Sequence, residues 1–162
     1  VQDAYNYLLH TKKRFDIILA DFPDPHDETI AKLYTVEFFM LIKKALRNDG
    51  IFVTQSTSPY FATQAFWCIH NTMKKVFHQV TPYHIYIPSF GDWGFNMATK
   101  RKYNIFTQNI SIKNLQYYSL KAFKQALHFT PDIKHRATKI NNFNRPLLYN
   151  YYNKGWKHKV DY

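Results

Sequence analysis

The chain has 162 residues, enough for one domain that buries about two-thirds of the surface its unfolded form exposes. A hydrophobic fraction of 46% excludes an intrinsically disordered chain, and the single cysteine, Cys68, excludes an intramolecular disulfide and a zinc site built from several thiolates. The formal net charge of +11 indicates a polyanionic neighbour, either nucleic acid or an anionic membrane surface, unless the Lys and Arg residues form only a solvated face.

The beginning of the chain alternates helical and extended patterns. DAYNYLLHTKK predicts a helix with Asp3 at its N-cap, and FDIILAD predicts a short, fully buried strand after it. Apolar residues at helical spacing then run from Thr29 until the sequence NDG ends the pattern at Gly50. This part of the chain therefore predicts helix, strand, helix.

The next part continues the alternation and ends in a hairpin. IFVTQ predicts a second strand, and a helix of about 16 residues is predicted from near Pro59, which suits a first helical turn. The runs YHIYIPSF and WGFNMATK predict two more strands, joined by a tight turn at residues 91–92. The whole order predicts an α/β fold with a mostly parallel sheet, covered on both faces, and a terminal antiparallel strand.

The composition changes after Lys100 to one rich in Asn, Tyr and Lys, with two short helical patterns near LKAFKQALHF and PLLYNYYNKGW. We therefore predict an α/β part over residues 1–100 and a basic helical extension over residues 101–162. No stretch reaches the roughly 18 to 20 uninterrupted apolar residues of a membrane span. Because the chain begins with Val1, we expect a fragment of a longer protein.

Several polar groups follow predicted strands at the end where open α/β sheets bind ligands. Asp21 and Asp24, in DFPDP, follow the first strand, Gln55 ends the second, and Phe90 lies between the last two. Each taken alone is an ordinary loop residue, since Asp before Pro is a common turn former. Because all four are predicted to lie at the same edge of the sheet, together they favour a ligand site there.

Three stretches resemble the carboxyl half of the polyamine aminopropyltransferases, the spermidine synthase family. They are FDIILADFPDP, LYTVEFFMLIKKALRNDGIFVTQSTSP and IPSFGDWGF. FGDWGF and NNFNRPLLYNYYNKGW are most similar to the branch with transmembrane helices ahead of the catalytic domain. The resemblance implies a Rossmann-like sheet of the class I methyltransferase type, in a cytoplasmic domain attached to the membrane by upstream segments.

The resemblance also implies roles for the acids. Asp21 matches the carboxylate that accepts the proton of the attacking amine, and Asp24 matches the acid that holds the charge of the diamine. Gln55 matches a glutamine that helps to bind the amine substrate. Phe90 stands where the soluble enzymes have a substrate-binding Tyr, so its polar contact is lost. A primary amine with a pKa near 10 is protonated at neutral pH and must lose a proton before it can attack. Carboxylates beside the site can attract the amine and accept that proton, and this chemical argument is independent of the resemblance.

The co-substrate and partners follow in the same way. Asp3 and Ala4 match the Asp and small residue that contact the adenine of decarboxylated S-adenosylmethionine, the aminopropyl donor. No cofactor beyond this co-substrate is implied, and the His residues show no metal-ligand spacing such as HExxH. The implied partners are a small polyamine substrate, an anionic membrane surface and a second copy of the chain, with nucleic acid less favoured.

Two alternatives remain open at this point. FPDP also occurs in methyltransferases that form 7-methylguanosine in tRNA, although that family continues with Trp and a basic run where this chain has HDETIAKLY. A noncatalytic module that retains the fold is the second. The Gly-rich turn of a nucleotide-binding half is absent from these residues, so we expect this chain alone to be inactive.

Overall fold

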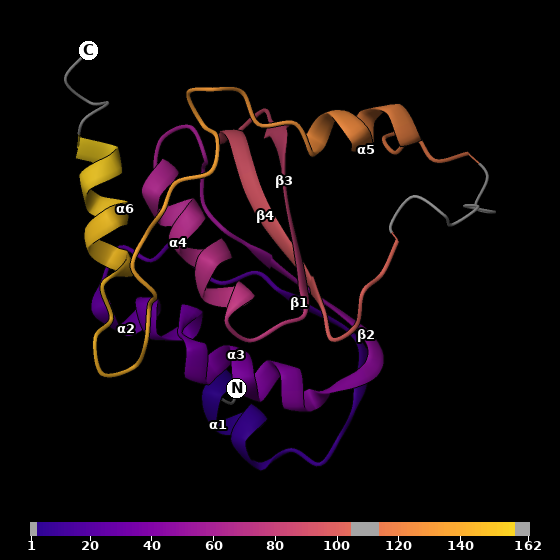
Figure 1. Ribbon diagram of the computed structural model, residues 1–162, viewed down its shortest axis with the longest axis vertical. Helices are drawn as coiled ribbons and strands as arrows, with labels where there is room; N and C mark the ends of the chain where they lie inside the picture. The colour runs from indigo at the N-terminus through magenta and orange to yellow at the C-terminus, as the bar shows by residue number, and fades with distance from the viewer. Residues whose placement is uncertain (1–2, 105–113, 158–162) are drawn as a thin grey trace.

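The computed structural model describes residues 3–104 and 114–157. A four-stranded sheet in the order β1-β2-β4-β3 lies at its centre, with helices packed against it (Figure 1). The strands are β1 (Phe15–Ala20), β2 (Leu46–Gln55), β3 (Gln79–Ile87) and β4 (Gly91–Thr99). The helical elements are α1 (Ala4–His10), α2 (Glu28–Ala31), the 3-10 helix η1 (Lys32–Tyr34), α3 (Val36–Ala45), α4 (Thr63–Lys74), α5 (Leu120–Ala126) and α6 (Leu148–Lys157). The predicted alternation and both helices of the extension are confirmed.

The strand directions also agree with the prediction. β1 pairs with β2 in parallel, whereas β4 is antiparallel to both β2 and β3. It follows that β1, β2 and β3 run in one direction, and that β4 is the single antiparallel strand of the sheet. The hairpin folds back so that β4 lies between β2 and β3, which brings the end of β2 close to the start of β4.

The single helical pattern predicted from Thr29 to Gly50 is divided into α2 with the adjoining η1, and then α3. Thr35 interrupts it in an extended conformation, and its hydroxyl accepts a hydrogen bond from the amide of Phe38 at 3.3 Å, which makes it the N-cap of α3. The periodicity is preserved across this break, so it did not reveal the cap. The helix also ends earlier than predicted, at Ala45.

Three boundaries differ from the predicted ones. β2 begins at Leu46, before the NDG turn signal, because its first residues pair with the start of β1. α4 begins at Thr63, after a turn that follows Pro59. In the hairpin, Ile87 pairs with Gly91, so residues 88–90 form the loop and the predicted turn residues open β4. Strand pairing therefore set the start of β2 and the hairpin loop, whereas a turn precedes α4.

The described helices bury mainly one face of the sheet, so the predicted cover on both faces is only partial in the described residues. Phe52 of β2 and Ala98 of β4 are paired in register, so they point to the same face, and both are fully buried. α3 packs against β2 there, and α4 packs against β3 and β4. Cys68 of α4 is buried in this core, as predicted.

The opposite face is open near β1. Ile17 is 61% exposed and Leu19 is 74% exposed, so the prediction that this strand is fully buried is wrong for the described chain. β1 lies at the edge of the sheet, and α5 covers only the far end of this face, where Phe123 meets Tyr83 of β3. Among the described residues, no helix is long and apolar enough to span a membrane.

The carboxyl-terminal segment packs into the helical layer. Asn141 is fully buried, and its side-chain amide donates to the carbonyl oxygens of Ala31 (2.8 Å) and Tyr34 (3.1 Å). Its side-chain oxygen accepts from the amides of Leu147 and Leu148, at the start of α6. α6 then packs against α4 and α2, with Leu148 fully buried. The segment before α6 is thus tied to the start of the molecule by a satisfied polar side chain.

Candidate active site

A cavity of about 660 Å³ lies at the carboxyl ends of β1 and β2, on the open face of the sheet. It is lined by Leu19, Ala20, Asp21, Phe22, Asp24, Val53, Gln55, Tyr83, Ile87, Phe90, Trp93 and Phe95. Four of the residues singled out from the sequence, Asp21, Asp24, Gln55 and Phe90, therefore line a single cavity. They come from three separate regions of the chain and meet because parallel strands end at the same edge.

The two carboxylates lie in different surroundings. Asp21 directly follows β1 and is exposed to solvent at the cavity wall. Asp24 is partly buried, and its Oδ1 and Oδ2 atoms accept hydrogen bonds from Gln55 (3.3 Å) and Tyr152 (2.9 Å). The loop turns tightly just after Asp24, since the amide of His26 donates to the Asp24 carbonyl. Asp21 is thus accessible to solvent, whereas hydrogen bonds fix the carboxylate of Asp24.

Gln55 is the centre of a buried polar cluster. Its amide oxygen accepts from the amide of Thr57 at 2.8 Å, which turns its Nε2 group toward the acidic loop. That Nε2 lies 2.6 Å from the Phe22 carbonyl oxygen and 2.9 Å from the Tyr34 hydroxyl. The Tyr34 hydroxyl in turn donates to the carbonyl of Pro23 at 3.1 Å. The amide hydrogens of Gln55 therefore hold the loop that carries both acids.

Thr57 has an unusual backbone beside this cluster. Its φ angle is 60°, a left-handed value that is rare for a β-branched residue and costs of order 1–3 kcal/mol. The side chain is fully buried, and its hydroxyl oxygen has no hydrogen-bond partner among the described residues. Strain of this kind collects at ligand sites, which supports the placement of the site here.

Opposing effects act on the Asp24 carboxyl. Burial raises the pKa of Asp24, because it disfavours the charged form, and this is the largest effect. Hydrogen bonds from Tyr152 and Gln55 and the charge of His26 lower it and offset part of the rise. Burial also raises the pKa of Tyr34 well above its ordinary value, with the Asp24 charge adding to the rise. The phenol of Tyr34 therefore stays a proton donor.

The rest of the cavity wall is apolar. Phe90, 58% exposed, lies in the hairpin loop with its ring centre 5.2 Å from that of Trp93. Tyr83 and Phe95 stack with a centroid distance of 5.3 Å. A cavity with apolar walls and two acids at one end suits a ligand with a hydrocarbon chain and cationic ends.

Asp3 and Ala4 are not part of this cavity. The Asp3 side chain accepts a hydrogen bond from the amide of Asn6 at 2.9 Å, which confirms its predicted position as the N-cap of α1. Ala4 packs against the hydrophobic core. Their predicted contact with adenine remains a prediction. In the described part of the chain, no group of three or more His, Cys, Asp or Glu side chains is arranged to hold a metal ion.

Three residues of this site were not predicted from the sequence: Tyr34, Thr57 and Tyr152. Tyr34 fits the apolar spacing of its helix, which suggested only a core position. Thr57 lies two residues after Gln55, but its positive φ carries no sequence signal. Tyr152 is 128 positions from Asp24, and its side chain reaches the loop only because α6 folds back over it.

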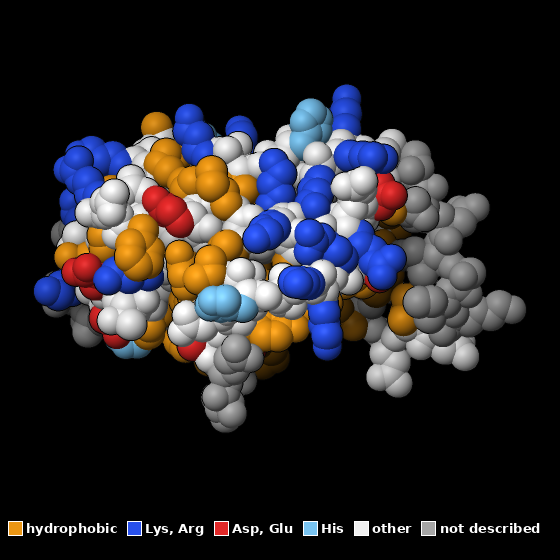
Figure 2. Space-filling view, turned by 90° about the horizontal axis from the view of Figure 1, so that it is seen from below, with side chains coloured by type: hydrophobic (Ala, Val, Ile, Leu, Met, Phe, Trp, Pro, Cys, Tyr) orange, Lys and Arg blue, Asp and Glu red, His pale blue; other side chains and the backbone are white. Residues whose placement is uncertain are grey.

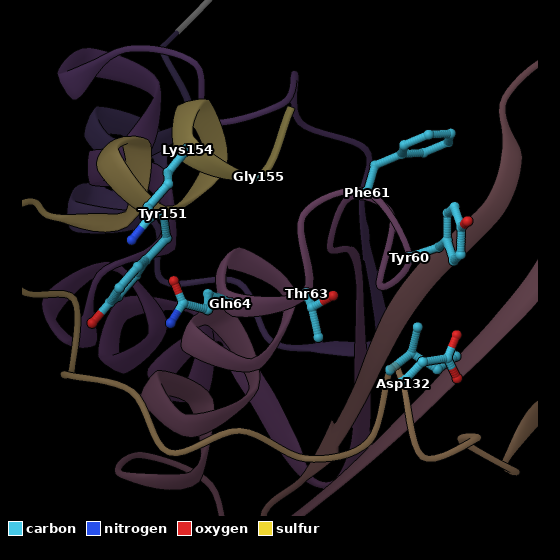
Figure 3. A pocket seen from close by; sticks show the side chains of 9 residues that line it. Tyr60, Phe61, Thr63, Gln64, Asp132, Tyr151, Lys154 and Gly155 are labelled. Carbon is cyan, nitrogen blue, oxygen red and sulfur yellow. The ribbon is translucent and has the colours of Figure 1, made fainter. Parts of the chain in front are cut away.

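A second cavity, of about 430 Å³, lies between the start of α4 and α6 (Figure 3). Its lining is Tyr60, Phe61, Thr63, Gln64, Asp132, Ile133, Tyr151, Lys154 and Gly155. In Figure 3, Tyr151 and Lys154 project from α6 on one side, with Tyr60 and Phe61 on the other. It contains none of the catalytic, substrate-binding or co-substrate-binding residues selected from the sequence.

The sheet order, the single antiparallel strand and the acids at the strand ends define a Rossmann-like α/β domain of the methyltransferase type. The spermine/spermidine synthase domain matches residues 1–110 of this chain. The chain therefore belongs to the spermine/spermidine synthase family. This match favours the aminopropyltransferase resemblance over the tRNA methyltransferase alternative.

Individual relatives agree. A polyamine aminopropyltransferase of Leptospira interrogans is 33% identical over 159 residues, which cover 98% of this chain and 32% of the relative. Polyamine aminopropyltransferase 1 of Streptomyces coelicolor is 41% identical over 96 residues, or 59% of this chain and 18% of the relative. The chain thus spans about a third or less of the length of these relatives.

Solved structures support the fold. A spermidine synthase in complex with the transition state analogue AdoDATO superposes with a TM-score of 0.66 at 23% identity, over 78% of this chain and 45% of that chain. Spermidine synthase from Thermotoga maritima superposes with a TM-score of 0.64 at 23% identity, over 80% and 46% of the two chains. The open face beside β1 is consistent with a chain that spans less than half of these enzymes.

Proposed function

We propose that the protein containing this chain transfers an aminopropyl group from decarboxylated S-adenosylmethionine to a diamine such as putrescine. The products are spermidine and methylthioadenosine, and the reaction belongs to polyamine biosynthesis. Family membership supports this function, and the observation that carries it is the meeting of Asp21, Asp24 and Gln55 in one cavity with apolar walls. The described residues form part of the site, and the chain alone is expected to be inactive.

The two acids have different roles in this reaction. The amine nitrogen attacks the carbon beside the sulfonium, the new C–N bond forms as the C–S bond breaks, and the bonding pair leaves with sulfur. The nitrogen must first lose a proton, because its pKa near 10 leaves it protonated at neutral pH. Asp21, accessible at the end of β1, accepts that proton. Asp24, held by hydrogen bonds, binds the charge of the diamine.

The other residues selected from the sequence also have roles in the proposal. Phe90 packs against the hydrocarbon chain of the diamine without a polar contact, and Gln55 keeps the acidic loop in place. Asp3 and Ala4, at the start of α1, contact the adenine of the co-substrate, together with residues outside this chain. The reaction as written uses no metal ion. We retain residues 1–100 as the catalytic half-domain and 101–162 as its extension.

We also propose a cytoplasmic domain attached to a membrane through other segments of the protein. Half of the 22 Lys and Arg residues lie where β1, β2 and β3 begin, opposite the cavity. This basic end consists of Lys12, Lys13, Arg14, Lys43, Lys44, Arg47, Lys74, Lys75, Lys100, Arg101 and Lys102. Figure 2 shows a band of Lys and Arg side chains on the underside of the molecule. Such a surface suits anionic lipid headgroups.

The sequence also places basic residues around Trp156, including Lys154 and Lys157, and this pattern predicts a second lipid contact, which has less support. Trp156 stacks on Phe61 with a centroid distance of 4.7 Å, and its indole nitrogen is buried. The neighbouring His158 and Lys159 lie outside the described residues. Self-association remains an expectation based on the family resemblance.

The test of the catalytic proposal uses the full-length protein. Aminopropyl transfer to putrescine is measured for the wild type, Asp21→Asn and Asp24→Asn, with thermal unfolding followed in parallel. We expect Asp21→Asn to lower kcat by about 100-fold or more, in line with typical general base contributions. Asp24→Asn should raise the diamine KM more than it lowers kcat.

Three results would contradict the proposal. Turnover close to wild type in Asp21→Asn would mean that this acid is not the base, and that it only supports the turn. Methyl transfer to tRNA by the wild-type protein, without aminopropyl transfer, would rule out the reaction itself. Loss of about 0.5–2 kcal/mol of stability in each variant, with turnover nearly intact, would show that the acids only cap the turn and the following helix.

A further inference from the structure

The carboxyl-terminal helix makes direct polar contacts with the acidic loop. The Tyr152 hydroxyl of α6 donates to Oδ2 of Asp24 at 2.9 Å, and the Asn153 side-chain amide donates to the carbonyl of His26 at 3.0 Å. These two contacts connect consecutive residues of α6 to the same turn of the loop. The loop is therefore held from outside the sheet as well as by Gln55 from the strand end.

The position of α6 is itself set by close packing. Leu148 at its start is fully buried, and Trp156 near its end stacks on Phe61. Between them, a Cβ atom at Gly155 would lie 2.8 Å from both the Ala62 Cα atom and the Phe61 carbonyl oxygen. Only glycine allows this approach to the backbone ahead of α4. Figure 3 shows Gly155 on α6 above Thr63 and Gln64 of α4.

The two hydrogen bonds orient the Asp24 carboxylate. Gln55 donates to Oδ1 and Tyr152 donates to Oδ2, from opposite elements of the fold. A carboxylate oxygen accepts more than one hydrogen bond, so each keeps room for an ammonium N–H. Fixing both oxygens in advance lowers the ordering cost of binding a flexible cation.

We infer that Tyr152 is a positioning residue for diamine binding, and that α6 acts as a clamp that holds Asp24 in its binding orientation. This inference rests on the proposed aminopropyl transfer and names a residue that acts through Asp24. Burial and the neighbouring Asp24 charge raise the pKa of Tyr152, so the phenol stays protonated and keeps donating. Helix α6 docks through Leu148 and Trp156, so we expect the fold to persist when the Tyr152 hydroxyl is removed.

The test compares two variants of the full-length protein that remove one hydroxyl each. Tyr152→Phe removes the donor to Asp24. Tyr151→Phe, on the same helix, removes a hydroxyl that only accepts from the Lys139 amide at 3.4 Å and serves as the matched control. We expect Tyr152→Phe to raise the putrescine KM about 10-fold, as for the loss of a hydrogen bond to a charged group. The KM for decarboxylated S-adenosylmethionine and the thermal midpoint should stay at the control values.

The pH profile separates positioning from a structural role. The titratable groups that face Asp24 are Asp21 and His26 on its own loop, Tyr34 of η1 and Tyr152 of α6. Because the Tyr152 hydrogen bond favours the charged carboxylate, its removal should raise the pKa of Asp24. The acidic limb of kcat/KM for putrescine should therefore move to higher pH in Tyr152→Phe only. Gly155→Ala should push α6 outward, and we therefore expect it to raise the putrescine KM as Tyr152→Phe does.

The outcomes distinguish this inference from the proposed reaction. An unchanged putrescine KM and pH limb in Tyr152→Phe would overturn the clamp, as would an equal rise in KM for both substrates with a lowered thermal midpoint. If the wild type transfers no aminopropyl group, the proposed reaction fails, and putrescine binding by calorimetry then tests Tyr152. Weaker binding in Tyr152→Phe than in Tyr151→Phe supports the clamp, and equal or undetectable binding in all forms overturns it.

Discussion

Asp21 and Asp24 are three positions apart, yet the structure prepares them for different chemistry. Solvent reaches Asp21, so a proton that it accepts has a path away from the site. Burial and hydrogen bonds act on Asp24 in opposite directions, which leaves a carboxyl whose charge depends on its neighbours. A cationic ligand beside it would favour the charged form. This difference arises in part from α6 and Gln55, whose side chains donate hydrogen bonds to Asp24.

His70 provides a pH prediction at the same scale. It is 5% exposed and 2.9 Å from the Asn96 side-chain oxygen, and burial lowers the pKa of His70 from 6.5 to about 4. The unfolded chain therefore binds a proton that the folded chain does not, between about pH 6.5 and pH 4. The contribution of His70 to stability is present above pH 6.5 and is lost as the pH falls through this window. We expect a loss of up to about 3 kcal/mol from this group.

Denaturant unfolding across this pH range tests the prediction. His70→Gln removes the titrating group and should flatten the decline in unfolding free energy. His78→Gln, at an exposed position, is the control for the loss of an imidazole and should keep the wild-type decline. If the unfolding free energy of His70→Gln declines with falling pH as steeply as that of the wild type, groups other than His70 cause the acid sensitivity.

At the scale of elements, backbone hydrogen bonds of Gly94 connect β4 to the loop that follows β2. The amide of Gly94 donates to the Thr57 carbonyl at 2.9 Å, and its own carbonyl accepts from the amide of Ser56 at 2.8 Å. These bonds continue the pairing beyond Gln55 and hold Thr57 in its left-handed conformation. The inserted position of β4 in the sheet thus shapes the loop that faces Asp24.

A methyl group at position 94 should disturb this junction. A Cβ atom there would lie 2.4 Å from Cε2 of Phe66 and 2.7 Å from the Thr57 carbonyl oxygen. We expect Gly94→Ala to destabilise the protein by about 1–3 kcal/mol, as for other overpacked cores. In a double-mutant cycle monitored by thermal unfolding, Phe66→Leu should recover part of the loss. Strictly additive effects would show that the Phe66 ring is not the obstacle.

For the whole molecule, charge separates along the strand direction. The basic end lies where the parallel strands begin, and Asp21 and Asp24 lie where they end. At the basic end, burial lowers the pKa of Lys100, and the charges of Arg14 and Lys43 lower it further. The ion pairs there, Arg47 with Asp16 and Arg101 with Asp49, are exposed and contribute little. A dication approaching this molecule is therefore favoured at the cavity and repelled at the opposite end.

This polarity predicts binding to anionic vesicles through the basic end. Cosedimentation at low salt should be lost in a variant with Lys12, Lys13 and Arg14 changed to Glu, and it should weaken as ionic strength rises. Changing Lys154 and Lys157 to Glu is the control, because these residues lie on α6. If vesicle binding depends on the α6 lysines instead, the membrane contact lies on that helix and the prediction is wrong. If the protein shifts tRNA in a gel at the same salt, RNA is favoured over lipid as the partner of the basic end.

The sequence by itself determined the kinds of elements and the position of the site. Periodicity distinguished helices from strands, and a general property of open α/β sheets placed Asp21, Asp24 and Gln55 at one edge. These inferences depend on local pattern and on chain order. The family resemblance rested on the same stretches, which is why the match to residues 1–110 agrees with it.

Tertiary structure decided what depends on distant contacts. The break at Thr35 was hidden because periodicity continues across a cap, and the start of β2 was set by pairing with β1. Tyr152 reaches Asp24 through a helix whose docking needs Leu148 in the core and glycine at position 155. No local pattern encodes a contact across 128 positions, because its free energy arises only when both segments are already packed.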